Sequence, residues 1–521
     1  MRYQETNLSV INSVNLGNTG RYLEARNALL DLSKLHPKNN YIMVNIASLC
    51  FVMQDLDHVE INLDQFMRND EKTYPEFYQI ASDLYIRSAC FSKAIQCMQR
   101  VTNYFPDDES SWGMFAQTAF ESRDPENAIY AVKKLLAINP ANYEAKVLYA
   151  NLLSSKGDFE HSESILMEVF KVAPWHSVAC SVLSKCRKFS DDGTQALALF
   201  DKALKTDNPN ETDDIDAEAR IYYAKAKIFN DQQNYDQAWV EASRANAIRA
   251  KNTPFDQAEY SRFIDQIISQ FSNIDYAANS SNSEKQPILI VGMPRSGTTL
   301  TEQILSLDDS IYPGGEKRGL DYALLMAFKG NDYLQGIGSA NREQTIELAT
   351  RYYRYFSAFS NYKGDRIVNK VPANYLHLGI FKLMFPKIKI INMQRNPLDV
   401  SVSIFFEHFS EMLNYTNDMS DIILVYKEYR KIMDFWKTQF ADDILDINYQ
   451  DLTENYEENK QKIIDFCGLK IDLDSQHENA KNLVETPSVW QVRQGIYKSS
   501  VERWKRYEKQ LKEFTYILDQ T

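Results

Sequence analysis

Three prolines recur at a constant interval in the first half of the chain. Pro106, Pro140 and Pro174 lie 34 residues apart, and each closes a segment with helical character. Pro37 falls two such intervals before Pro106, to within one residue. A fixed period of this length is typical of stacked helix pairs, in which each pair buries its apolar side against the next pair. The spacing therefore predicts an all-α solenoid.

Small side chains form two further rows with the same period. One row stands twelve residues before the prolines: Ala25, Ala94, Ala128 and Ser162, continued by Ala196 and Ala238. The second row stands another twelve residues earlier: Ser82, Ala116, Ala150, Ser184 and Ala226. Small residues at these places let the two helices of one pair approach closely. The pattern resembles the tetratricopeptide family over about residues 5 to 250.

The chain is expected to divide into a repeat domain, residues 1–270, a linker, residues 271–286, and a second domain, residues 287–521. A helix around Phe255 to Phe271 is expected to cap the array, and the Ser- and Asn-rich stretch after it shows no hydrophobic periodicity. Solenoids commonly hold a peptide or a protein on their concave face. The residues leave open whether this array captures a substrate, spaces the domains or forms a homodimer.

A glycine-punctuated turn opens the second domain. The apolar run PILIV predicts a buried strand, GMPRSG a tight turn, and TTLTEQILSL a helix. Backbone N–H groups of such a turn and the helix N-terminus bind anions. The turn matches both glycines of the nucleotide-triphosphatase loop GxxxxGK[ST], but Thr298 stands where that loop has lysine. We therefore predict a phosphate–sulfate group, bound without a metal by Arg295, Ser296, Gly297, Thr298 and Thr299.

A second anion anchor is predicted in the segment FPKIKIINMQRNPLDVSVSIFF. A strand ends at Arg395, Pro397 starts a helix, and Ser403 lies on that helix, eight residues after the arginine. An arginine and a hydroxyl placed in this way can hold a phosphate from two sides.

The two segments together resemble the sulfotransferase family. The PRSGTT turn is similar to the family's 5'-phosphosulfate loop, and Arg395 with Ser403 matches its 3'-phosphate motif. The resemblance covers Pro287 to about Tyr507. It implies an α/β domain with a central parallel sheet, 3'-phosphoadenosine 5'-phosphosulfate (PAPS) as sulfuryl donor, 3',5'-ADP as product, and no metal.

Two residues between these motifs are the candidates for catalysis. Glu316 follows a Gly-Gly turn, and Lys370 ends the predicted strand IVNK. Resemblance to the protein-tyrosine and the bacterial tetratricopeptide sulfotransferases implies that Glu316 is the base and that Lys370 lies at the bridging oxygen. A carboxylate can take the acceptor's proton, and an ammonium can neutralise charge on the leaving phosphate. His377 and His408 are weighed as alternatives, because other cytosolic sulfotransferases use a histidine base.

The C-terminal segment resembles the family less closely. Tyr449 ends a predicted strand and matches a tyrosine that approaches the nucleotide, and Ser488 matches a serine that stabilises the transition state. In YKSSVERWK, the resemblance places Lys498 near the 3'-phosphate, although the arginine and glycine of the family's loop are missing, so Arg493 is an alternative contact. An amphipathic helix is expected around Trp504.

Composition excludes several other classes of protein. The formal charge of -13 disfavours a nucleic-acid partner. The N-terminus lacks the apolar core of a signal peptide, and no stretch approaches the ~20 apolar residues that span a membrane. We expect a cytoplasmic protein with no membrane association. The six cysteines are scattered, and the seven histidines are not grouped, so no metal site is assigned.

The sequence thus predicts a PAPS-dependent sulfotransferase that acts on an acceptor hydroxyl. The resemblance favours a tyrosine of a peptide or protein held by the repeats, and it leaves a glycan, a lipid or a small phenol open. Two other functions are considered. A kinase would share the strand, loop and helix, and a non-catalytic scaffold would use the repeats alone.

Overall fold

The computed structural model describes residues 11–53, 55–69, 73–190, 192–207, 214–328, 340–359, 362, 366–470 and 501–520. The chain separates into two compact units. The first comprises Met1–Ala145, Gly319–Asn331 and Thr350–Tyr362. The second comprises Lys146–Arg318, Asp332–Ala349 and Lys363–Thr521. Each unit therefore combines repeat helices with segments from the second half of the chain.

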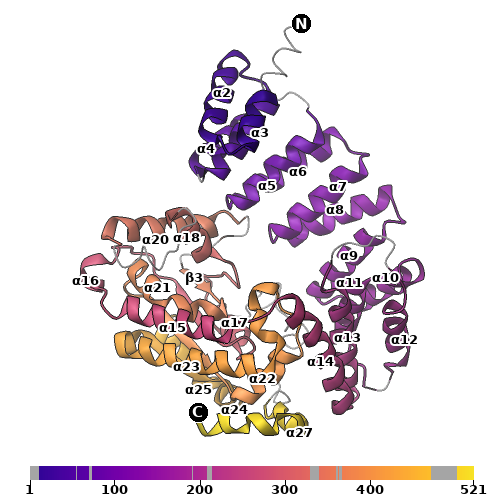
Figure 1. Ribbon diagram of the computed structural model, residues 1–521, viewed down its shortest axis with the longest axis vertical. Coiled ribbons are helices and arrows are strands. Elements are labelled where there is room, and N and C mark those ends of the chain that lie inside the picture. Colours follow the sequence, from indigo (N-terminus) through magenta and orange to yellow (C-terminus); the bar gives the residue numbers. More distant parts are fainter. Residues whose placement is uncertain are drawn as a thin grey trace. The chain divides into compact units, whose positions relative to one another are not determined.

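Successive helices make up the repeats, as the proline spacing predicted (Figure 1). The first unit holds α2 (Tyr22–Leu35), α3 (Asn40–Val52), α4 (Leu56–Arg68), α5 (Pro75–Arg87), α6 (Phe91–Tyr104), α7 (Glu109–Glu121) and α8 (Pro125–Ile138). Further along the chain come α9 (Tyr143–Lys156), α10 (Phe159–Val172), α11 (Ser177–Cys186), α12 (Thr194–Ala203), α13 (Ala217–Asp231) and α14 (Tyr235–Asn252). Pro106, Pro140 and Pro174 each follow the end of a helix by two residues.

The two rows of small residues form the inside of the helix pairs. Every member of both rows is buried. The rows meet at Ser162, whose hydroxyl donates a hydrogen bond of 2.7 Å to the carbonyl oxygen of Ala150. N-cap side chains stabilise the starts of helices: Asp108 and Asp124 each accept a hydrogen bond from a backbone N–H of the first turn. The small residues thus permit close packing, and the caps mark where helices begin.

A part of the second half of the chain packs on the first repeats. This part consists of α18 (Gly319–Phe328) and the C-terminal end of α20 (Arg342–Ser357). The Phe359 ring stacks on Phe91 of α6 at 4.3 Å between centroids. The Ser92 hydroxyl donates to the carbonyl oxygen of Ala358 at 2.9 Å, and Arg354 pairs with Glu60. These contacts explain why residues 350–362 belong to the first unit.

Five parallel strands form the sheet of the second unit, as the resemblance implied. Their order is β2-β3-β1-β4-β5, and every pair is parallel. The strands are β1 (Ile288–Gly292), β2 (Ile311–Pro313), β3 (Arg366–Asn369), β4 (Lys389–Gln394) and β5 (Ile444–Asn448). All residues of β1 are buried, which suits a continuous apolar run at the centre of a parallel sheet.

Helices cover the sheet, and their apolar residues complete its core. Ile304 and Leu305 of α17 and Ile463 of α25 share one cluster with strand residues such as Ile290 and Ile391. The helical segments of this domain include α17 (Thr298–Leu305), η1 (Pro372–His377), α21 (Leu378–Met384), α22 (Pro397–Phe405), η2 (Glu411–Asn417), α23 (Met419–Phe440), η3 (Ala441–Asp443), α24 (Tyr449–Glu454) and α25 (Tyr456–Cys467). Those after residue 500 are η6 (Arg503–Tyr507), α27 (Glu508–Leu511) and η7 (Lys512–Gln520).

The segment between the repeats and the sheet is folded against the sheet domain. Helix α15 (Gln257–Phe271), expected as a cap of the array, packs along α23, where Phe271 meets the Trp436 ring at 5.5 Å. The expected linker contains the short helix α16 (Tyr276–Asn279). The Ser281 hydroxyl donates to the carbonyl oxygen of Met384 at 2.6 Å. A stretch without apolar periodicity is therefore held by hydrogen bonds.

The last repeat helices contact the sheet domain through apolar and charged groups, and Figure 1 shows α14 beside α22. The Trp239 ring of α14 stacks on Phe405 at 4.6 Å, and the Asn246 side chain donates to the carbonyl oxygen of Phe405 at 2.9 Å. Both contacts involve Phe405, two residues after Ser403 of α22. The repeats thus support the end of the helix that carries a predicted phosphate contact.

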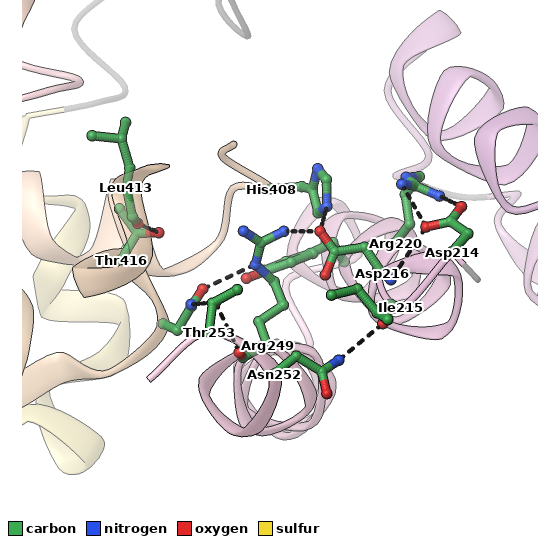
Figure 2. Close-up of polar contacts among 12 residues, drawn as sticks. Asp214, Ile215, Asp216, Arg220, Arg249, Asn252, Thr253, His408, Leu413 and Thr416 are labelled. Carbon is green, nitrogen blue, oxygen red and sulfur yellow. Dashed lines mark hydrogen bonds and ion pairs between the residues drawn. The ribbon is translucent and has the colours of Figure 1, made fainter. Parts of the chain in front are cut away.

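A charged group accompanies this contact, and we call Asp216, Arg249, His408 and Asn417 the docking cluster. Figure 2 shows Arg249 and His408 directed at the Asp216 carboxylate. Arg249 Nη1 and His408 Nε2 lie 2.6 and 3.0 Å from Asp216 Oδ2. Arg249 Nε also donates to Asn417 Oδ1 at 3.0 Å. The cluster joins α14 and the N-cap of α13 to His408, in the loop before η2, and to Asn417, the last residue of η2.

Candidate functional site

The predicted site residues gather at one edge of the sheet. Glu316 follows β2, Lys370 follows β3, and the GMPRSG turn follows β1. Arg395 follows β4 and Tyr449 follows β5. Because all five strands are parallel, their carboxyl ends lie at the same edge, which is where open α/β sheets bind ligands.

The turn after β1 depends on its two glycines. A Cβ on Gly292 would lie 2.5 Å from the carbonyl oxygen of Met393, and one on Gly297 would lie 2.4 Å from the Tyr449 ring. Both glycines have positive φ, 148° and 103°, and Arg295 between them has φ 68°. The backbone can therefore pass close to β4 and Tyr449 only without side chains at these places.

Helix α17 begins directly after this turn, with Thr298 as its first residue. The first N–H groups of a helix have no partner within the helix and favour an anion. Ser296 adds a buried hydroxyl that has no hydrogen-bond partner within the described part of the chain. A buried hydroxyl without a partner, beside a helix N-terminus, can donate a hydrogen bond to a phosphate or sulfate oxygen.

The two predicted anion anchors are in direct contact. Arg295 Nε donates to Ser403 Oγ at 3.0 Å, and Arg395 Nη1 donates to the carbonyl oxygen of Arg295 at 2.7 Å. The Arg395 guanidinium also lies over the Tyr449 ring, 4.8 Å from its centroid. Burial lowers the pKa of Arg395. Glu407, which was not among the predicted site residues, lies 3.8 Å from Arg295 and offsets part of this positive charge.

Glu316 and Lys370 form an ion pair at the same sheet edge as the anchors. Lys370 Nζ lies 2.6 Å from Glu316 Oε1. The Lys370 side chain is 1% exposed, whereas that of Glu316 is 49% exposed. The pair therefore has one buried partner and one that a substrate can reach from solvent.

Backbone contacts hold the turn that carries Glu316. Asn369 Nδ2 donates to the carbonyl oxygens of Gly315 and Lys317 at 3.2 and 3.0 Å, and Asn374 donates to Asn369 Oδ1. On the other side, Glu302 of α17 accepts the N–H of Gly315. Asn369 and Glu302 were not among the predicted site residues. Asn369 is adjacent to Lys370, so its place at the strand end was a usable signal, while nothing local marked Glu302.

The C-terminal segment reaches the second anchor through backbone groups. Asp399 of α22 accepts hydrogen bonds from the N–H groups of Glu502 and Trp504 at 2.8 and 2.9 Å. Burial raises the pKa of Asp399. The amphipathic helix expected around Trp504 is a 3₁₀ helix of five residues, η6. The predicted residues Ser488, Arg493 and Lys498 lie outside the described residues.

The alternative histidines have other surroundings. His408 belongs to the docking cluster, where burial and the nearby charges of Arg249 and Arg220 lower its pKa to about 4. His377 is the last residue of η1. His408 is thus engaged by the repeats, and the groups at the sheet edge are Glu316 and Lys370.

Within the described ranges, no group of three or more His, Cys, Asp or Glu side chains could hold a metal ion. Among the same residues, no helix has both the length and the apolar character needed to cross a membrane.

Comparisons with known proteins agree with this architecture. A family model described as "Sulfotransferase family" matches residues 287–473, and one described as "Tetratricopeptide repeat" matches residues 119–178. An uncharacterized protein of Aquifex aeolicus is 30% identical over 397 residues, covering 73% of this chain and 51% of that protein. The chain thus spans about half the length of this relative.

Two more distant similarities are to proteins described as sulfotransferases. A putative protein-tyrosine sulfotransferase of Caenorhabditis briggsae is 24% identical over 196 residues, covering 37% of this chain and 70% of that protein. The solved sulfotransferase domain of the Synechococcus PCC 7002 olefin synthase is 19% identical, covers 44% of this chain and 90% of that chain, and has a TM-score of 0.31. Residues 287–473 therefore form a sulfotransferase-family domain, and tetratricopeptide repeats precede it in the same chain.

Proposed function

We propose that this protein transfers a sulfuryl group from PAPS to an acceptor hydroxyl. The observation that carries the proposal is the half-exposed Glu316 paired with the buried Lys370 at 2.6 Å, at the same sheet edge as the lysine-free anion turn. Such an edge offers a proton acceptor, a buried cation and an anion cradle together. The sulfotransferase-family match of residues 287–473 supports this reaction class.

The residues present fit PAPS by their chemistry. The glycine cradle leaves no room for a Cβ, and the Ser296 hydroxyl has no hydrogen-bond partner among the described residues. These groups, with the N-terminus of α17, would hold the 5'-phosphosulfate. Arg395 and Ser403 would hold the 3'-phosphate, and Tyr449 would contact the nucleotide. Because Thr298 stands in place of lysine, the turn lacks the cation that grips a triphosphate.

When bound, PAPS supplies the activated sulfuryl group. Glu316 accepts the proton of the acceptor hydroxyl as the new oxygen–sulfur bond forms. Lys370 would neutralise the negative charge that develops on the leaving phosphate oxygen. An ammonium has three N–H donors, so the bond to Glu316 leaves two of them for this oxygen. Ser488 is assigned a role in stabilising the transition state by resemblance alone.

The acceptor is proposed to be a tyrosine of a peptide or protein. Two observations support this choice: the Caenorhabditis briggsae relative is named a putative protein-tyrosine sulfotransferase, and tetratricopeptide repeats commonly bind peptides. A glycan, a lipid or a small phenol are the other acceptors that an experiment has to compare.

The test measures both binding and transfer. The purified chain is titrated with 3',5'-ADP by calorimetry, then incubated with labelled PAPS and a tyrosyl peptide, an oligosaccharide, a lipid or a phenol. We expect 3',5'-ADP to bind, and Arg395→Ala to weaken binding about 10- to 100-fold, because a charged hydrogen bond is lost. Absence of 3',5'-ADP binding, or unchanged binding by Arg395→Ala, would refute the proposal. Magnesium-dependent ATP turnover would indicate a kinase instead.

A further inference from the structure

A carboxylate outside the predicted site lies against the turn of the proposed base. Glu302 is on α17, the helix that the anion turn starts. Its Oε1 accepts a hydrogen bond of 2.7 Å from the backbone N–H of Gly315, the residue before Glu316. One helix thus begins at the anion turn and, through Glu302, reaches the turn that carries the proposed base.

The Gly315 backbone is held from two sides. Its carbonyl oxygen accepts hydrogen bonds from the Lys370 N–H at 2.9 Å and from Asn369 Nδ2 at 3.2 Å. Its N–H is held by Glu302. Gly315 also has a positive φ of 57°, so this turn has a conformation that few sequences adopt without support.

The charges around Glu302 are those of the site itself. Burial raises its pKa, the Lys370 and Lys317 ammonium groups and the Gly315 N–H lower it, and the Glu316 carboxylate raises it. A carboxylate that is half-buried among these groups is placed at the centre of the site rather than on a solvated helix face.

We propose that Glu302 is a positioning residue, whose hydrogen bond to Gly315 fixes the turn that presents Glu316 beside Lys370. This proposal rests on the proposed function of Glu316. Glu302 does not itself contact the reacting atoms. Its contribution is to link the anion turn and the base turn rigidly, since a misplacement of about 1 Å can lower a rate about 100-fold.

The first test needs no substrate. Hydrogen exchange of the Gly315 amide is compared in the free wild-type protein, Glu302→Ala and Glu302→Gln, because the glutamine carbonyl oxygen can still accept the hydrogen bond. We expect exchange at least about tenfold faster in Glu302→Ala and nearly unchanged in Glu302→Gln. Gln303→Ala on the same helix is the control for helix propensity. Unchanged protection of Gly315 in Glu302→Ala would overturn the proposal.

The second test measures transfer from labelled PAPS to a tyrosyl peptide. Glu302→Ala is expected to lower kcat about 10- to 100-fold with 3',5'-ADP affinity within about twofold, and Glu302→Gln to restore most of the rate. In a Glu316→Gln background, Glu302→Ala should add no further loss, because its effect passes through Glu316. A further loss of the full size would contradict the proposal.

The two failures are distinguishable. If wild type transfers no label to any acceptor while Glu302→Ala still loses protection at Gly315, the proposed function is wrong and the positioning contact stands. If transfer depends on Glu316 but the Gly315 amide is indifferent to Glu302, the positioning role is wrong and the proposed function stands.

Discussion

Two ion-pair groups of the second unit differ in which partners are open to solvent. In the docking cluster, Arg249 is 1% and Asp216 11% exposed at the side chain, and both are held between repeat helices and the sheet domain. In the Glu316–Lys370 pair, the lysine is equally buried but the glutamate is half exposed. In the docking cluster both charged groups are shielded from solvent, whereas in the second pair the Glu316 carboxylate is accessible to solvent.

This difference has an energetic meaning. Removing one partner of a buried pair leaves an uncompensated charge, which destabilises the fold by about 3–5 kcal/mol. Replacing the half-exposed Glu316 by glutamine keeps a side-chain oxygen that can accept the hydrogen bond of the buried Lys370, so stability changes less. We therefore expect the docking cluster to govern stability and the Glu316–Lys370 pair to govern activity.

The largest expected effect is on catalysis. Glu316→Gln keeps the shape of the side chain but removes the proton acceptor, so transfer from labelled PAPS should fall about 100- to 10,000-fold. The affinity for 3',5'-ADP, measured by calorimetry, and the unfolding midpoint should remain close to wild type. Retained turnover would reassign the base, and a large loss of stability would remove the contrast with the docking cluster.

The next effect is on stability. Arg249→Met replaces the guanidinium by an apolar side chain and leaves the Asp216 carboxylate buried, which should lower the free energy of unfolding by about 3–5 kcal/mol. Urea unfolding at neutral pH measures this change. Lys251→Met serves as the control, since Lys251 lies on the same helix and is exposed, so we expect a change below about 1 kcal/mol. Equal effects of the two variants would contradict the distinction.

The smallest effect concerns pH. The folded pKa of His408, about 4, lies below its ordinary value of 6.5. Between these two values the unfolded chain binds a proton that the folded chain does not. The stability from neutral His408 is therefore fully present above pH 6.5 and is lost as pH falls toward 4, by up to about 3 kcal/mol.

His408→Gln tests this linkage. Glutamine can still donate a hydrogen bond to Asp216 but does not titrate in this range. We expect its unfolding midpoint in urea to fall less than that of wild type between pH 7 and pH 5, because the histidine proton uptake is absent. Parallel pH profiles for the two proteins would show that His408 does not titrate as the structure indicates.

Much of the fold was predictable because its signals are local. The 34-residue spacing of prolines follows from the length of one helix pair, and the apolar run before Gly292 follows from the burial of a central parallel strand. Arg395 and Lys370 could be identified because each directly follows such a strand. Because the carboxyl ends of parallel strands lie at one edge of the sheet, residues at these ends are expected to lie close together.

Other features were not predictable for a physical reason. The Ser- and Asn-rich stretch before β1 contains no periodic apolar residues, yet backbone contacts to Leu383 and Met384 hold it. The bond between Arg295 and Ser403 joins residues assigned from sequence to two separate anchors. Such contacts depend on how turns and helices pack against one another in three dimensions, and no pattern of neighbouring residues predicts this packing.

By itself, the sequence determined the repeats, the parallel strands and the residue types at the strand ends. These features depend on the spacing of apolar and small residues that are close together in the chain. Only the tertiary structure decided which charged side chains are buried in ion pairs and which are exposed to solvent. His408 meets Asp216, 192 residues earlier in the chain, and Glu302 meets the backbone of Gly315, 13 residues later in the chain. Both contacts arise from packing of whole elements, since burial and pairing of a charge depend on every surface that surrounds it.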